Sequence, residues 1–149
     1  MALDCLVKFK NIPGESQVTD HEDWIECQAF SVGVASSGGN TTELKDFSFT
    51  HKIDKASPKL VGACCGDEDL EEVTIHLLEE GTLYMEWKLL PGSRASGADA
   101  NTLRVSSVIP SGDDTSVGRP SEKVTVRYGK IELTYSEGNI RAAYDASLS

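Results

Sequence analysis

The chain has 149 residues, enough for a single domain to bury its own apolar core without disulfides or metal ions. Its formal net charge of -10 disfavours nucleic acid and anionic membranes as partners, because both are bound largely through excess Lys and Arg. Asp4, Lys8 and Lys10 interrupt the apolar residues at the N-terminus, and no later apolar run approaches membrane-spanning length. We therefore expect a cytoplasmic product with no signal peptide and no membrane insertion.

Apolar and polar residues alternate with a period of two from end to end, which is typical of β-sandwiches and β-barrels. Residues 5–9 and 46–53 predict two of the strands. Residues 73–77 and 83–89 predict a hairpin whose turn contains Gly81. The predicted fold class is all-β.

In two of the predicted strands the apolar residues shift partway along from odd-numbered to even-numbered positions or the reverse, which is a change of parity. Within residues 24–35 the change falls near residues 29–31, which indicates a bulge or bend, or a segment covered on both faces. Within residues 123–135 it falls at Gly129, which indicates a bulge or a barrel corner.

One helix is predicted, about two turns long. Ser57 is a suitable N-cap, Pro58 suits the first helical position, and Gly66 ends the apolar stripe that follows. A helix this short is suited to plug one end of a barrel or to cover a sheet edge.

The remaining segments are predicted to be loops within one domain spanning residues 1–149. Residues 36–40 indicate a mobile loop, residues 90–102 a long loop or frayed hairpin tip, and residues 111–121 a second polar loop. Residues 138–149 form a tail too short for a second domain.

The residues that could form a catalytic or metal-binding site are scattered along the sequence. His21, His51 and His76 have no metal-binding spacing, and the glycine-rich runs match no catalytic or phosphate-binding motif. His51 is expected to be buried and His76 exposed. We expect no enzymatic activity, no metal and no cofactor, although the many carboxylates leave an unrecognised enzyme as an alternative.

The cysteines are too sparse for a disulfide scaffold, and none forms a CxxC pair. Cys5 and Cys27 occupy apolar positions of strand-like segments, where a reduced thiol packs as a small hydrophobic group. For the adjacent pair Cys64 and Cys65, a redox role is the alternative.

Several segments, taken in order, resemble the haemolysin-coregulated protein (Hcp) family, the inner-tube subunits of type VI secretion systems. Their joint order and spacing carry the resemblance more than any single motif. They are DCLVKFKNIPGES (residues 4–16), WIECQAFSVGVASSG (24–38), DFSFTHKIDKASPKL (46–60), VTIHL (73–77), LRVSSV (103–108) and EKVTVRYGKIELTY (122–135).

The resemblance implies a closed or nearly closed β-barrel or sandwich with one short helix. It implies that six copies form a ring and that rings stack into a tube, which also acts as an effector carrier or chaperone. Its partners would be other copies of the chain, the secretion sheath and spike proteins, and effector proteins. The protein would leave the cell through the type VI apparatus.

The resemblance also indicates which residues contact other subunits. An extended loop at about residues 36–45 would reach a neighbouring subunit or the next ring. Gln28 and Ser31 are the candidates for lumen or effector contacts. The candidate subunit and ring interface comprises Gly14, Glu15, Ser16, Trp24, Ser36, Ser37, Gly38, Gly39, Asn40, Thr41, Thr42 and Glu43.

Two segments depart from the family pattern. Residues 90–102 intervene where the family commonly runs directly between two strands, and the tail after Tyr135 is longer than expected. The inserted segment would alter a contact between rings, and the tail would dock either on the barrel itself or on a neighbouring copy. A monomeric or dimeric sandwich that binds a ligand through its long loops is the alternative function.

Overall fold

The computed structural model describes residues 3–38, 41–66, 69–92, 103–112 and 118–145, without the side chains of residues 36–43 and 145. In chain order its elements are β1 (Leu3–Phe9), β2 (Ile25–Cys27), β3 (Ala29–Gly38), β4 (Thr41–Lys52), α1 (Ser57–Cys65), β5 (Val73–Glu79), β6 (Thr82–Leu90), β7 (Arg104–Ser111), β8 (Ser121–Arg127), β9 (Lys130–Tyr135) and β10 (Ile140–Asp145).

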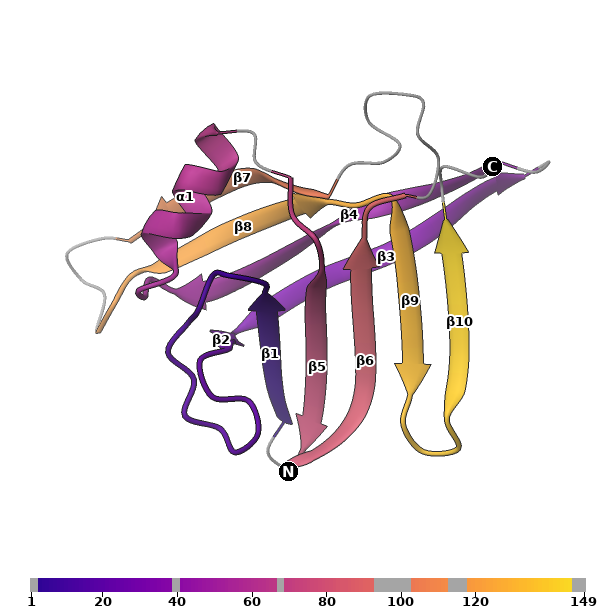
Figure 1. The fold of residues 1–149 in the computed structure, drawn as a ribbon, viewed down its shortest axis with the longest axis horizontal. Coiled ribbons are helices and arrows are strands. Elements are labelled where there is room, and N and C mark those ends of the chain that lie inside the picture. Colours follow the sequence, from indigo (N-terminus) through magenta and orange to yellow (C-terminus); the bar gives the residue numbers. More distant parts are fainter. Residues whose placement is uncertain (1–2, 39–40, 67–68, 93–102, 113–117, 146–149) are drawn as a thin grey trace.

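The strands form two antiparallel sheets that pack against each other (Figure 1). One is six-stranded in the order β10-β9-β6-β5-β1-β2, and the other is four-stranded in the order β3-β4-β8-β7. Over the described residues, the strand pairing of one sheet does not continue into the other. The all-β prediction is confirmed, and the architecture is sandwich-like instead of a closed barrel.

The alternation of the sequence places one face of each sheet in a shared core. On β4, Phe47 and Phe49 are buried and pair with Val126 and Val124 of β8, which are also buried. Ile75 of β5 is among the buried residues that the opposite sheet contributes to the same cluster. Burial of each such side chain contributes about 1.5–3 kcal/mol.

Both predicted parity changes occur where the chain passes from one sheet to the other. Gln28 separates β2 from β3, and its N–H donates to the Thr50 carbonyl at 2.7 Å. Gly129 separates β8 from β9, and its N–H donates to the Leu90 carbonyl at 3.0 Å. When the chain crosses from one sheet to the other, the core lies on the opposite face of the strand. The alternate set of residues then points into the core.

The predicted helix is present as α1 and lies near β7 and β8 at one end of the sandwich (Figure 1). Its N-cap is Ala56, without a side-chain capping bond, so the prediction of Ser57 as N-cap is wrong. The Ser57 hydroxyl instead accepts from the Asp54 N–H at 3.1 Å, and an Asp54 carboxylate oxygen accepts from the Ala56 N–H at 2.9 Å. Gly66 ends the helix as expected.

Two predicted loops contain more strand than expected. β3 continues to Gly38 and β4 begins at Thr41, so most of residues 36–45 belong to a long hairpin. Cross-strand pairing extends the hairpin because these polar residues still complete backbone hydrogen bonds. Much of the predicted tail is β10, which pairs with β9. Most of the two polar loops, residues 93–102 and 113–117, lies outside the described residues.

Candidate functional site

The Gly14-Glu15-Ser16 turn is held inside the fold by backbone hydrogen bonds. The Gly14 N–H donates to the Asp23 carbonyl at 2.7 Å, and the Ser16 N–H donates to the Trp24 carbonyl at 2.9 Å. A Cβ on Gly14 would lie 2.5 Å from the Trp24 carbonyl oxygen, so only glycine fits. Gly14 and Ser16 are buried and Trp24 is half-buried. Their contacts therefore shape this segment of the subunit itself.

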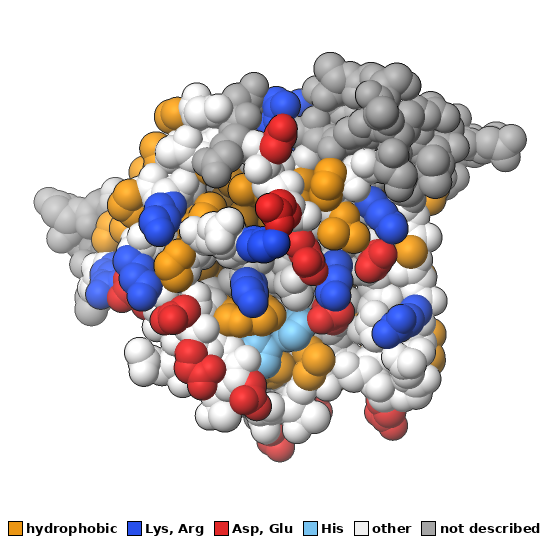
Figure 2. Space-filling model, in the orientation of Figure 1, with side chains coloured by type: hydrophobic (Ala, Val, Ile, Leu, Met, Phe, Trp, Pro, Cys, Tyr) orange, Lys and Arg blue, Asp and Glu red, His pale blue; other side chains and the backbone are white. Residues whose placement is uncertain are grey.

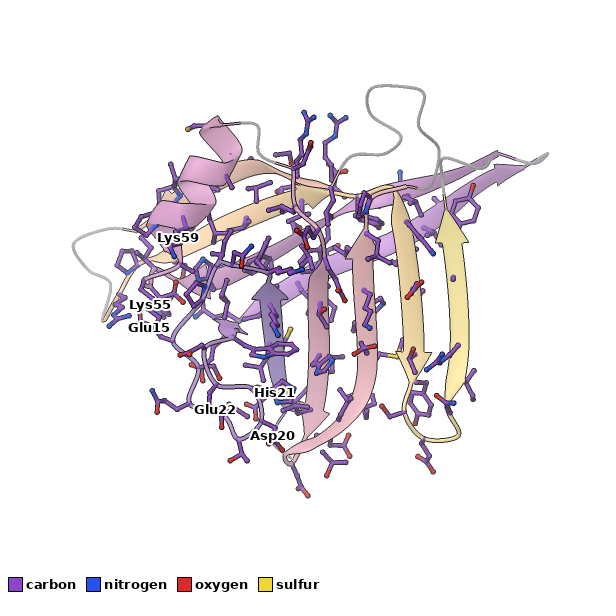
Figure 3. All side chains as sticks on the ribbon, in the orientation of Figure 1. Glu15, Asp20, His21, Glu22, Lys55 and Lys59 are labelled. Carbon is purple, nitrogen blue, oxygen red and sulfur yellow. The ribbon has the colours of Figure 1, made fainter. Side chains whose placement is uncertain are left out.

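Glu15 connects this turn to the start of α1. Its carboxylate accepts a hydrogen bond from the Lys55 N–H at 2.7 Å and lies 3.4 Å from Nη1 of Arg119. Figure 3 shows Glu15 beside Lys55 near the helix. The positive end of the helix dipole favours a carboxylate at this position.

Two histidines far apart in sequence meet on the outer side of the six-stranded sheet. Nε2 of His21 lies 2.8 Å from Nδ1 of His76, whose Nε2 lies 2.6 Å from the Glu86 carboxylate. The Trp24 ring packs against both imidazoles, and Nζ of Lys8 lies 5.7 Å from the centre of that ring. Figure 2 shows the histidines among charged and apolar side chains.

His76 is half-buried by this packing, so the prediction that it is exposed is wrong. Burial lowers the pKa of His76, although Glu86 acts in the opposite direction. Within the described ranges no group of three or more His, Cys, Asp or Glu side chains is arranged to hold a metal ion. The His21 and His76 nitrogens face each other across a hydrogen bond.

His51 is fully buried, as predicted, and lies in a second cluster between the sheets. Its Nε2 lies 2.8 Å from the Glu122 carboxylate and its Nδ1 lies 3.7 Å from that of Asp54. Burial opposes protonation, but the two carboxylates outweigh it and raise the pKa of His51. Its partners are carboxylates of the same chain, so this cluster belongs to the interior of the subunit.

The β3–β4 hairpin extends beyond the rest of the sandwich (Figure 1). On its β3 arm Val34 is 56% exposed. Among the predicted interface residues, backbone pairing places Ser36 opposite Thr42 and Gly38 opposite Thr41. Gly39 and Asn40 lie outside the described residues, as do the side chains of Ser36, Ser37, Gly38, Thr41, Thr42 and Glu43.

The four-stranded sheet ends in β3 on one side and β7 on the other. Over the described residues neither outer edge pairs with another strand. Ile109 on β7 is 57% exposed, although nothing in its local sequence pattern marks it as a contact residue. The LRVSSV segment had identified the strand, but its edge position depends on the order of strands in the sheet.

The outer face of this sheet carries a row of hydroxyl side chains. The register places Ser31 opposite Ser48, Ser48 opposite Thr125, and Thr125 opposite Ser107, across all four strands. Ser31 was a predicted lumen residue and is exposed. Gln28 is also exposed, and its side-chain oxygen accepts from the Ser121 hydroxyl at 2.9 Å. The two predicted lumen residues thus lie on exposed positions of the β2–β3 segment.

Comparison with known proteins identifies the family of this chain. The model of the family described as "Type VI secretion system effector, Hcp" matches residues 6–135. The chain belongs to the Hcp family. It is 25% identical over 155 residues to Protein hcp1 of Pseudomonas aeruginosa, covering 97% of this chain and 90% of that protein.

Solved Hcp structures share the fold over nearly the whole chain. Hcp1 from Salmonella typhimurium has a TM-score of 0.84 at 23% identity, covering 100% of this chain and 98% of that one. A type VI secretion system effector from Yersinia pestis has a TM-score of 0.79 at 26% identity, covering 95% and 99%. This Hcp protein is therefore a secreted protein of the type VI secretion system.

The Hcp family consists of structural proteins of secretion and is not an enzyme family. None of the helices in the described part of this chain is long and apolar enough to cross a membrane.

Proposed function

We propose that this Hcp protein is an inner-tube subunit of the type VI apparatus. Copies form a hexameric ring, rings stack, and the tube carries effector proteins while contacting the sheath and spike. The protein acts by association without turnover, and it is assembled in the cytoplasm before secretion. The observation that carries the proposal is the four-stranded sheet, whose two edge strands have no further strand paired with them in the described part of the chain.

The direction of the two edge strands suits a ring. The four strands are antiparallel to their neighbours throughout, so β3 and β7 run in opposite directions. When copies are related by rotation about one axis, β7 of one copy meets β3 of the next in antiparallel orientation. Such a head-to-tail contact uses a different edge on each copy, and it closes into a ring that leaves no edge of the four-stranded sheet unpaired.

Exposed apolar side chains favour this contact. Val34 on β3 and Ile109 on β7 are each more than half exposed, on opposite edges of the same sheet. Pro110 follows Ile109 on β7, a position that only an edge strand tolerates. Burial of the two aliphatic side chains between copies contributes to association.

The hydroxyl row supports the assignment of the tube lumen. Phe47 and Phe49 of β4 face the core, so Ser48 between them faces the other side of the sheet. In the proposed ring this face forms the inner wall. Small hydroxyl groups provide a hydrated wall that does not hold a passing protein tightly.

The test is the oligomeric state, measured by native mass spectrometry and negative-stain electron microscopy. We expect rings of six copies for the wild-type chain. Val34→Asp and Ile109→Asp should each shift the population to monomer, because an unpaired carboxylate would be buried in the contact. Ile140→Asp is the matched control, since Ile140 is 65% exposed on β10 of the other sheet.

The monomeric variants should still unfold in one cooperative thermal transition, which separates lost association from misfolding. A wild-type monomer at high concentration would contradict the proposal and favour the binding-module alternative. Ser31→Trp tests the lumen separately: the ring should still form, with a narrower central opening in class averages. An unchanged opening would reject Ser31 as a lumen residue.

A further inference from the structure

Two of the free cysteines are direct neighbours across a strand pair. Cys5 on β1 is opposite Cys27 on β2, and the two strands are antiparallel. Opposed residues of such a pair point to the same face, with Cα atoms about 4.5–5.5 Å apart. A disulfide requires a Cα separation of about 4.4–6.8 Å. The register therefore already provides the spacing for a bond.

The pair is accessible from solvent. Cys5 and Cys27 both line a pocket of about 340 Å³, and both are half-buried. The pocket is lined by charges of both signs, namely Lys52 and Arg119 together with Asp4, Glu15, Glu26 and Asp54. Because the pocket is open to solvent, a small-molecule disulfide can reach the sulfur atoms. β2 has only three residues and lies at the edge of its sheet, so it can adjust to a new bond.

The two thiols differ in acidity. A hydrogen bond from Cys5 lowers the pKa of Cys27, against the effect of burial. The same hydrogen bond, together with burial, raises the pKa of Cys5. Cys27 is thus the thiol that becomes a thiolate first and acts as the nucleophile.

We propose that Cys5 and Cys27 form an intramolecular disulfide by exchange with a small-molecule disulfide such as oxidised glutathione. The Cys27 thiolate attacks one glutathione sulfur, forms a mixed disulfide and releases one glutathione thiolate. That thiolate takes the Cys5 proton, and the Cys5 sulfur then attacks the Cys27 sulfur and releases the second glutathione. The two cysteines lose two electrons and two protons in total, and oxidised glutathione gains them.

The disulfide would form after export, because disulfides persist outside the reducing cytoplasm. The bond would connect β1 to β2 immediately before Gln28, where the chain passes to the other sheet. It would close the loop that contains the Gly14-Glu15-Ser16 turn. The inference concerns thiols within one copy and does not depend on ring assembly.

The test is to reduce the purified protein, expose it to oxidised glutathione, block free thiols with N-ethylmaleimide and digest it with trypsin under non-reducing conditions. We expect the denatured single chain to lose the mass of two hydrogen atoms. Trypsin should release residues 1–8 joined to residues 11–45. The bond should also raise the melting temperature by about 5–10 °C, reversibly with dithiothreitol.

Matched variants locate the bond. Cys5→Ser and Cys27→Ser should each abolish the cross-linked peptide and the melting shift, and Cys5→Ser should accumulate a glutathione adduct on Cys27. The Cys64→Ser, Cys65→Ser double variant should behave as wild type. The proposal is overturned if reduced wild-type protein gives only glutathione adducts, a bond only between Cys64 and Cys65, or bonds only between copies.

Discussion

The hydroxyl of Tyr128 donates a hydrogen bond to the carbonyl oxygen of Lys45, 2.5 Å away. The Gly33 carbonyl oxygen is a second acceptor at 3.3 Å. Lys45 and Gly33 are paired across the β3–β4 hairpin, directly after a register shift between Ser31 and Gly33. The corner between β8 and β9 thus holds the hairpin where its regular pairing is interrupted. Burial raises the pKa of Tyr128 to about 12, so the hydroxyl stays a donor at neutral pH.

Tyr128→Phe should destabilise the protein by about 0.5–1.5 kcal/mol, because it removes a partly buried hydrogen bond between the side chain and the main chain of the hairpin. The loss of stability is measured by urea unfolding, with Tyr128→Phe introduced into a monomeric variant such as Ile109→Asp so that assembly does not contribute. Tyr135→Phe on the more exposed Tyr135 is the control and should cost much less. Equal losses in the two variants would show that the hydrogen bond is unimportant.

The raised pKa of His51 predicts a pH-dependent stability. Because the native pKa lies above the unfolded value of about 6.5, protonated His51 stabilises the fold below pH 6.5, and this contribution is lost as pH rises through the native pKa. Glu122→Gln should remove part of it, so the variant should lose more stability near pH 6 than near pH 9.

Chemical denaturation at several pH values checks this expectation. Glu26→Gln at an exposed position of β2 is the control and should show no such trend. If the stability lost in Glu122→Gln instead grew with pH, protonated His51 would not be a stabilising group.

Gly14→Ala tests the close approach of the Pro13–Gly14 turn to Trp24. The added methyl group would lie 2.5 Å from a backbone oxygen, so the turn must shift, at a cost of about 1–3 kcal/mol. Gly62→Ala is the matched control in α1, where a Cβ would meet no atom within 4 Å. It should stabilise the helix by about 0.5–1 kcal/mol. Thermal unfolding of both variants separates steric conflict from helix propensity.

Glu15→Gln tests the link between the turn and α1. We expect a loss of about 0.5–1 kcal/mol, since the bond to the Lys55 N–H becomes weaker and the charge near the helix terminus is removed. The loss should shrink in high salt, because this carboxylate is partly exposed. Glu137→Gln at an exposed position should be neutral. If Glu15→Gln instead left stability unchanged but weakened assembly, Glu15 would be an interface residue.

Local pattern was sufficient to predict most of the elements. Alternation identified the strands, and the changes of parity marked the two places, β2 to β3 and β8 to β9, where consecutive strands lie in different sheets with only one or two residues between them. Polar composition was a weaker guide at the β3–β4 hairpin. Backbone pairing there does not require apolar side chains, so residues that looked like a loop are mostly strand.

The sequence by itself thus determined the all-β class, the single helix near Pro58 and the resemblance to the Hcp family. Only the tertiary structure decided which strands lie at the edges, and which distant side chains meet. His21 meets His76, and Cys5 lies opposite Cys27, because β1 pairs with both β2 and β5. Strand order and register come from long-range packing, and period-two alternation carries no information on which strand becomes the neighbour of which.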